Sequence, residues 1–324
     1  MNTILQQWIT GQVLLVSSRL MSTGITRDWG VAIHGGAGSI PVEMPPGRRD
    51  ECMAALKGIL ELGVQLLSAG TAAVDVAEQL VTGLEDESLF NAGRGSVFNI
   101  DGEHELEAAI MDGSSLDCGA AAGLRTVRNP IRLARCIMDH TGHVMLAGSG
   151  AEEYAQSIGM ERVDPSWFDT DRRLSELERF KAEPATLEQE GSTVGAVVRD
   201  VEGRLASATS TGGMTGKMAG RIGDSPLVGC GTYADEGCAV SCTGRGEDFV
   251  RHVAAHKVAL LAGSGGLGAR TAVERVLRMM PDAAGGIIAI DREGVPVALF
   301  SSRGMYRGRA DSTGLFETLI HGEE

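Results

Sequence analysis

The sequence predicts an α/β (α+β) protein in which two stacked sheets are covered by helices. Strand patterns cluster at the start of each half of the 324-residue chain, and helical patterns lie between and after them. This order differs from the strict strand–helix alternation that builds a parallel sheet. A hydrophobic fraction of 43% is enough for a large core, and the 45 glycines follow no period, which indicates many tight turns.

The first half begins with a strand and continues with two helices. Residues 29–40, WGVAIHGGAGSI, form a compact apolar run that contains several glycines, as a strand leading into a turn does. Apolar residues at helical spacing then predict a helix from Arg48 that breaks at Gly70, and a second helix over 72–81.

A hairpin and two shorter helices are expected next. An Asp-Gly dipeptide at 101–102 lies between apolar segments and predicts a hairpin whose return strand covers 106–111. Helical patterns follow over 130–138 and 152–156. From Asp169 to Glu190 half of the residues are charged, which predicts a solvated linker or a loosely attached helix, accessible to cutting.

Strand patterns resume in the second half. The glycine run GSGGLG follows a helical pattern rather than a strand, so it indicates a turn between two helices and not a dinucleotide site. The expected elements are a hairpin over 193–211, a strand over 237–244, helices over 249–263 and 271–280, and a final hairpin over 285–304.

Composition limits the partners and the compartment. A net charge of −14 argues against nucleic acid and against an anionic membrane surface, because both bind basic faces. No apolar run reaches the roughly 18 residues of a membrane span. The six cysteines form no C-x-x-C motif, which favours free thiols and a cytoplasmic protein. The seven histidines show no ligand spacing for a metal, and His34 is expected to be a hydrogen-bonding strand residue rather than a catalyst.

The residues that carry chemistry lie in the second half. Arg221 and Asp224 flank a glycine and present opposite charges, a combination that suits the carboxylate and the amine of an amino acid. Thr243 and Gly244 follow a strand and offer adjacent donors for an oxyanion. Thr193 begins a buried strand directly after the charged segment.

A threonine hydroxyl needs a base to act as a nucleophile, and no histidine is placed to serve Thr193. If the bond before Thr193 were cut, the residue would carry its own base, since a free α-amine titrates near about 7.7–8.0. The charged segment before it is a suitable place for such a cut.

Together these segments resemble a known family. The motifs HGGAG, LFNAGRGSVF, HELEAAIMDG, STVGAVV, ATSTGGMTGKMAGRIGDSPLVGCGTYAD and SCTGRGE resemble the plant-type asparaginase/isoaspartyl peptidase family, in matching order from Val31 to Arg303. These are N-terminal-nucleophile hydrolases with a four-layer αββα sandwich. The resemblance implies one domain over 29–324 and has no counterpart for the N-terminal extension, residues 1–28. We expect this extension either to be disordered or to arise from a mis-called start, with Met21 as the true first residue.

The resemblance also implies a role for each site residue. Self-cleavage between Ser192 and Thr193 would give an α chain of 1–192 and a β chain of 193–324, with Thr193 as nucleophile. The remaining implied roles are as follows: Thr211 assists the nucleophile, Asn91 orients it, Arg221 binds the substrate carboxylate, Asp224 binds its amine, and Thr243 and Gly244 form the oxyanion hole.

Further expectations from the resemblance are a structural sodium ion, no catalytic cofactor, and a dimer of αβ units. The ion would be held by the main-chain carbonyls of Leu84, Glu85, Glu87, Phe90, Ala92 and Arg94. Oxygen ligands suit such a hard cation.

This chain departs from the family pattern at positions that bear on the site. Ser192 stands where glycine is usual, which leaves two registers, with Thr193 or Ser192 as nucleophile; the strand pattern favours Thr193, because a one-residue slip turns every side chain to the other face. Arg245 stands where a small hydroxyl residue is common, and its charge would narrow the site or favour acidic leaving groups. Arg94 replaces a small or apolar residue in the ion loop, where its carbonyl still serves.

The predicted reaction is hydrolysis of β-aspartyl amides, with L-asparagine and β-aspartyl dipeptides both qualifying as substrates. One alternative is a glycosylasparaginase-like hydrolase, which Ser192 and the cysteine pattern disfavour. The other is an unprocessed amino-acid-binding homologue, in which Ser192 prevents self-cleavage.

Overall fold

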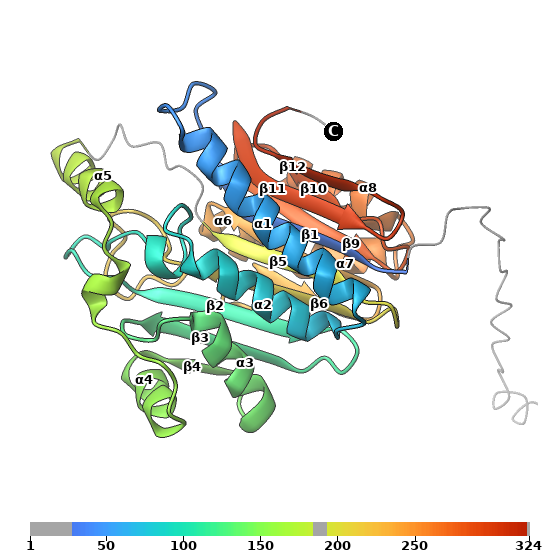
Figure 1. Cartoon of the computed structure of the whole chain (residues 1–324), viewed down its shortest axis with the longest axis horizontal. Coiled ribbons are helices and arrows are strands. Elements are labelled where there is room, and N and C mark those ends of the chain that lie inside the picture. The colour runs from blue at the N-terminus through green and yellow to red at the C-terminus, as the bar shows by residue number, and fades with distance from the viewer. Residues whose placement is uncertain (1–27, 184–192, 323–324) are drawn as a thin grey trace, which may run out of the picture.

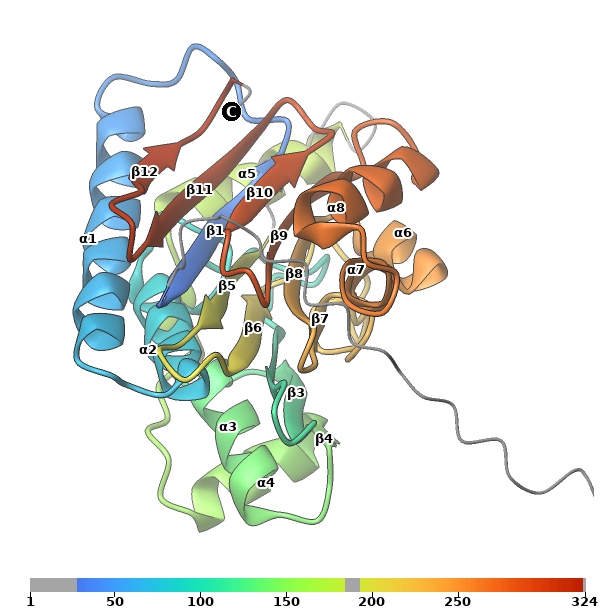
Figure 2. The same cartoon turned by 90° about the vertical axis from the view of Figure 1, so that its right-hand side faces the viewer.

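The computed structural model describes residues 28–183 and 193–322, and these residues form four layers. Figure 2 shows α1 and α2 on one side, two sheets in the middle, and α6, α7 and α8 on the other side. The predicted αββα sandwich is therefore confirmed. Segments from both halves of the chain alternate within the larger sheet, whereas the smaller sheet is built from the second half alone.

The larger sheet carries the strand that begins after Thr193. Neighbouring strands in this sheet run antiparallel, except for β3 and β4, which are parallel. In spatial order the strands are β12 (Phe316–Leu319), β11 (Gly304–Asp311), β1 (Gly30–Gly38), β5 (Val194–Arg199), β6 (Leu205–Thr211), β2 (Leu106–Asp112), β3 (Cys118–Leu124) and β4 (Met145–Ala147). The smaller sheet is antiparallel, in the order β10 (Val297–Phe300), β9 (Gly285–Asp291), β8 (Cys238–Gly244) and β7 (Thr232–Ala234).

α1, α2 and α3 cover the outer face of the larger sheet (Figure 1), and α7 and α8 cover that of the smaller sheet. Pro130 at the start of α3 has the fixed φ of a first helical turn, and the Thr170 hydroxyl caps α5 by accepting from the Arg173 amide. The helices are α1 (Arg48–Ser68), α2 (Ala73–Asp86), α3 (Pro130–His140), α4 (Gly148–Ser157), α5 (Asp171–Ala182), α6 (Gly246–His252), α7 (Ala254–Ala262) and α8 (Gly268–Met279), with short 3₁₀ turns η1 (Gly93–Gly95) and η2 (Pro165–Phe168).

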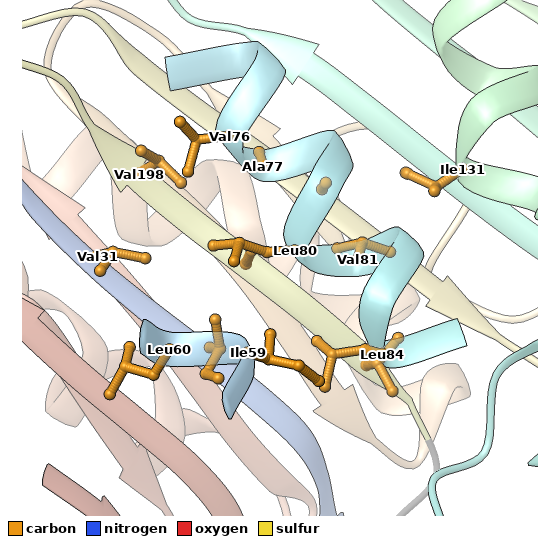
Figure 3. Packing of buried hydrophobic residues seen from close by; sticks show 14 of the residues in the cluster. Val31, Ile59, Leu60, Val76, Ala77, Leu80, Val81, Leu84, Ile131 and Val198 are labelled. Atoms are coloured by element: carbon orange, nitrogen blue, oxygen red, sulfur yellow. The ribbon is translucent and has the colours of Figure 1, made fainter. Parts of the chain in front are cut away.

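The largest hydrophobic cluster lies between α1, α2 and the larger sheet. From α2, Val76 lies beside Val198 of β5, and Leu80 points toward Val31 of β1 (Figure 3). A second cluster fills the space between the sheets and includes Ile288 of β9. Because all these side chains are buried, both sheets are fixed against each other, and the site described below rests on a rigid support.

One strand prediction was wrong, and another was confirmed but incomplete. The predicted turn forms at residues 101–102, where the Gly102 amide donates to the Asn99 carbonyl at 3.1 Å. The predicted hairpin does not form, because β2 pairs instead with β3 and with β6. The hairpin expected over 285–304 is present as β9 and β10, but two further strands, β11 and β12, follow it. β11 contains Arg307 and Arg309, which hid its strand pattern.

The charged segment after Asp169 is only partly a loose linker. α5 docks through Arg173 and Glu176, which are buried and paired with each other, and Arg173 Nε donates to the Gly95 carbonyl. The rest of the segment, residues 184–190, lies outside the described residues.

Other predictions concern single features. The GSGGLG run joins α7 to α8, as predicted. All six cysteines are free, and three of them, Cys52, Cys238 and Cys242, are buried. In the described part of the chain, no helix combines the length and apolar character that crossing a bilayer requires.

Candidate active site

Thr193 lies at the entrance to β5, in the middle of the larger sheet. Its neighbours β1 and β6 hold β5 on both sides, so the residue is buried, with 3% of its surface exposed. Its Oγ1 lies 3.4 Å from Oγ1 of Thr211 at the end of β6. The two threonines that the sequence singled out are therefore brought together by strand pairing across a hairpin.

His34 fixes the carbonyl of Thr193. Its Nδ1 lies 3.2 Å from that oxygen, which can only accept, so Nδ1 carries the proton. Its Nε2 then accepts from the Ser241 hydroxyl at 2.9 Å, and Ser241 lies 2.7 Å from the Thr209 hydroxyl. Burial lowers the pKa of His34 to about 3, so the ring is neutral. The prediction that His34 is a hydrogen-bonding strand residue is confirmed.

Gly195 makes room for this network. A Cβ at Gly195 would lie 2.1 Å from Ser241 Oγ and 2.5 Å from His34 Nε2. The glycine of the TVGAVV run is therefore required by a contact between the two sheets.

Asn91 holds the loop that follows Thr211. Its side-chain Nδ2 donates to the Gly213 carbonyl at 2.7 Å, and its Oδ1 accepts from the Val97 amide at 3.0 Å. The Gly213 amide donates to Thr211 Oγ1 at 2.9 Å. Asn91 thus orients the Thr211 loop, one step removed from Thr193.

Thr243 and Gly244 close β8 on the opposite sheet. Thr243 Oγ1 accepts from the Ala37 amide at 3.1 Å, which leaves its own proton available for a different acceptor. Gly244 has φ 138°, and a Cβ there would lie 2.2 Å from the Ala284 carbonyl oxygen. The chain therefore passes this point only with glycine.

Arg221 and Asp224 come together against Gly246. A Cβ at Gly246 would lie 2.8 Å from Asp224 Oδ1 and 2.9 Å from Arg221 Nη2. The Nε–Nη2 edge of Arg221 is already bound to both oxygens of Glu247, at 3.0 and 2.9 Å. A second carboxylate would therefore meet the Nη1 side of the guanidinium, and Gly246 and Glu247 belong to the site although the sequence did not single them out.

Asp224 is a buried carboxyl group with an unsatisfied oxygen. Only 4% of the residue is exposed, and within the described residues Oδ2 accepts no hydrogen bond. Burial raises the pKa of Asp224 to about 7, and the nearby Arg221 opposes this shift. A buried carboxylate of this kind is completed by a cationic ligand such as a substrate ammonium.

Glu107 and Lys217 form a buried pair beneath this loop that sequence reasoning missed. Lys217 Nζ lies 3.3 Å from Glu107 Oε1, and the Gly223 amide donates to Glu107 Oε2 at 2.9 Å. The pair fixes the backbone between Lys217 and Asp224. Both residues lie in motifs quoted from the sequence, HELEAAIMDG and MTGKM. They are 110 residues apart, however, and only the fold shows that they pair.

The loop after α2 is built around two glycines. A Cβ at Gly93 would lie 2.3 Å from the Glu85 carbonyl oxygen, and a Cβ at Gly95 would lie 2.0 Å from the Phe90 carbonyl oxygen. Carbonyl groups therefore crowd against η1, which is compatible with a carbonyl cradle for a cation. Among the described residues, no three His, Cys, Asp or Glu side chains form a metal site.

The remaining predicted positions are accounted for as follows. Arg94 is exposed, and its guanidinium lies 4.8 Å from the Trp167 ring centroid, so only its carbonyl is available to the loop. Arg245 is exposed and lies 3.7 Å from Asp248. Ser192 lies outside the described residues, as do residues 1–27.

A protein-family model described as asparaginase matches residues 27–320. The chain belongs to this family. The match includes every residue of the site described above.

Curated relatives of this asparaginase-family chain are similar to it in sequence over most of its length. The isoaspartyl peptidase of Escherichia coli (strain K12) is 46% identical over 306 residues, which cover 88% of this chain and 95% of that protein. A probable isoaspartyl peptidase/L-asparaginase 2 of Arabidopsis thaliana is 40% identical, with 90% and 98% covered. An isoaspartyl peptidase/L-asparaginase of Danio rerio is 40% identical, with 90% and 96% covered.

Proposed function

We propose that this chain is a self-processing hydrolase of β-aspartyl amides, acting on L-asparagine and β-aspartyl dipeptides. The observation that carries the proposal is the position of Thr193, buried at a strand entrance with Thr211 Oγ1 at 3.4 Å. Family membership and the printed names of the relatives support the same activity.

Maturation would free the base that the reaction needs. The Thr193 hydroxyl oxygen attacks the carbonyl carbon of Ser192, the C–N bond breaks, and water hydrolyses the resulting ester. The products are a carboxylate on Ser192 and a free α-amine on Thr193. His34 holds the Thr193 carbonyl throughout, since its bond does not involve the cut peptide group.

Hydrolysis would then use the same hydroxyl. The α-amine of Thr193 takes the proton of Oγ1, and Oγ1 attacks the side-chain carbonyl carbon of the substrate. The Thr243 hydroxyl and the Gly244 amide donate to the developing oxyanion. Ammonia or an amino acid leaves with the proton, and water then cleaves the β-aspartyl ester and restores Thr193.

The remainder of the site would select the aspartyl group. Arg221 would bind the substrate α-carboxylate through its Nη1 side, and Asp224 would bind the α-ammonium group through its unsatisfied oxygen. A substrate without the ammonium group would leave the buried Asp224 oxygen without a partner, and one without the carboxylate would lose the bond to Arg221, so both would bind more weakly.

The loop over 84–94 is proposed to hold a sodium ion through the main-chain carbonyls of the six residues named above. The close approach of carbonyls to Gly93 and Gly95 supports this proposal. Bound there, the ion would stabilise the loop that positions Asn91, and it takes no part in the reaction. Replacing sodium with choline should therefore lower the melting temperature, and an unchanged melting temperature would count against the ion.

Assembly and compartment are proposed on more general grounds. Family resemblance supports a dimer of αβ units, and the free cysteines support a cytoplasmic location. The same free thiols disfavour the glycosylasparaginase alternative, whose family is secreted or lysosomal with disulfides. The experiment below also distinguishes the other alternative, in which the chain binds an amino acid but is neither processed nor catalytic.

Hydrolysis itself is the direct test. The purified protein is incubated with L-asparagine and with β-aspartyl-leucine, and released aspartate is measured. We expect turnover of both by the wild-type chain and none by Thr193→Ala. Binding of L-asparagine without turnover would instead support the unprocessed binding homologue.

A further inference from the structure

We propose that a pocket beside Gly244 is a subsite for the leaving group, built to take an amino acid that carries negative charge. The inference rests on the proposed function, because it assigns the side of the site from which the amine departs. It deepens that function by ranking β-aspartyl peptides with an acidic second residue above L-asparagine.

The pocket lies next to the proposed oxyanion donor and has a volume of about 320 Å³. That volume is close to the lower bound of about 300 Å³ for ligand pockets, which suits a single amino acid. The described residues that line it are Ala37, Gly38, Ser39, Met214, Gly244, Arg245, Ala283, Ala284, Ser302 and Arg303.

The charge of this lining is opposite to that of the whole chain. Arg245 and Arg303 both line the pocket, and none of the described lining residues is acidic. The chain as a whole carries a net charge of −14. The two arginines therefore attract an anion to this pocket, although the net negative charge of the whole molecule repels anions.

Arg245 is anchored in a position from which it can reach a ligand. Its amide donates to the Ala284 carbonyl at 2.9 Å, which fixes the backbone between Gly244 and α6. Its side chain is 63% exposed and lies 3.7 Å from Asp248. That distance exceeds a hydrogen bond, so the contact does not use the guanidinium donors.

L-asparagine and β-aspartyl dipeptides differ in the leaving group that they would place in this pocket. Hydrolysis of L-asparagine releases ammonia, which offers no group to the arginines. Hydrolysis of a β-aspartyl dipeptide releases an amino acid whose α-carboxylate can pair with one guanidinium. A second residue such as glutamate adds another carboxylate, and the two arginines can then each pair with an anion.

The test compares dipeptides of equal shape and different charge. The kcat/KM is measured for β-aspartyl-glutamate, β-aspartyl-glutamine and L-asparagine, with the wild-type chain and with Arg245→Gln and Arg303→Gln. Arg251→Gln is the matched control, because Arg251 pairs with the same Asp248 at 3.2 Å but does not line the pocket.

We expect the wild-type chain to prefer β-aspartyl-glutamate over β-aspartyl-glutamine by about tenfold, the size of one charge-assisted hydrogen bond. Arg245→Gln should bring this ratio close to one, and Arg251→Gln should leave it unchanged. A wild-type ratio near one, or a ratio that survives in both pocket variants, would overturn the subsite while hydrolysis remains intact. Failure to hydrolyse any of the three substrates would overturn the proposed function and the subsite with it.

Discussion

At the scale of single residues, two side chains of the site can each form one more hydrogen bond. Thr243 accepts from the Ala37 amide and keeps its own proton, and Asp224 is buried with one oxygen unsatisfied among the described residues. Such groups cost stability in an empty site, because buried polar atoms are normally paired. Their cost is offset when a ligand supplies the missing partner.

Asp224→Asn tests this argument with a change of charge and almost none of shape. We expect kcat/KM for L-asparagine to fall by about 10- to 100-fold, since a hydrogen bond to a charged group contributes roughly 1.5–3 kcal/mol. Glu236→Gln is a suitable control, because Glu236 is an exposed carboxylate on the turn between β7 and β8. A decrease of less than threefold for Asp224→Asn would show that Asp224 does not bind the substrate ammonium.

The residues predicted from the sequence share one property, which is that their role follows from a short motif. Thr193, Asn91 and Arg221 are recognisable in this way. Glu107 and Glu247 are not, because their partners lie 116 and 26 residues away and a turn or strand has to bring them together. Residues that support a site through distant contacts are therefore the ones that a single sequence conceals.

At the scale of elements, the buried strand β11 was missed, and its two arginines explain why. β11 is buried along its whole length between β1 and β12. The guanidinium of Arg307 donates there to the carbonyls of Met305, Ile320 and Gly322. An arginine stabilised by backbone carbonyls looks like a surface residue in the sequence, so the strand that carries it was overlooked.

The contact of His34 joins three elements and predicts a dependence of stability on pH. His34 of β1 binds the residue before β5 and also Ser241 of β8, in the opposite sheet. Its pKa falls from about 6.5 to about 3 on folding, because burial disfavours the charged ring. This depressed pKa gives stability that is present above pH 6.5 and is lost as pH falls toward 3.

His34→Gln isolates this effect, because glutamine does not titrate. We expect the difference in unfolding free energy between the chain that keeps His34 and the His34→Gln variant to shrink by about 2 kcal/mol between pH 7 and pH 5. Urea denaturation is measured with both chains in a Thr193→Ala background, in which the chain stays continuous. Parallel pH curves for the two chains would contradict a neutral, buried His34.

At the scale of the whole molecule, the proposed cut leaves two interleaved chains. β5 and β6 of the proposed β chain lie between β1 and β2 of the proposed α chain, and β11 pairs with the other edge of β1. The two pieces share both the larger sheet and the core that packs on it. No rearrangement of the fold is needed after cleavage.

The processed protein should therefore migrate as one species under native conditions and separate only in denaturant. Size-exclusion chromatography followed by a denaturing gel of the peak measures this directly. Both fragments should appear in equal molar amounts in a single peak. Separation of the fragments in plain buffer would show that the sheet order described here does not hold after cleavage.

The central claim is that Thr193 becomes an N-terminal nucleophile, and one measurement tests it most directly. Intact mass and N-terminal sequencing are carried out on the purified chain after overnight incubation at neutral pH. The account predicts a fragment that begins Thr-Val-Gly-Ala. A fragment that begins Ser-Thr-Val would move the nucleophile to Ser192, and a chain that stays full-length would contradict the claim.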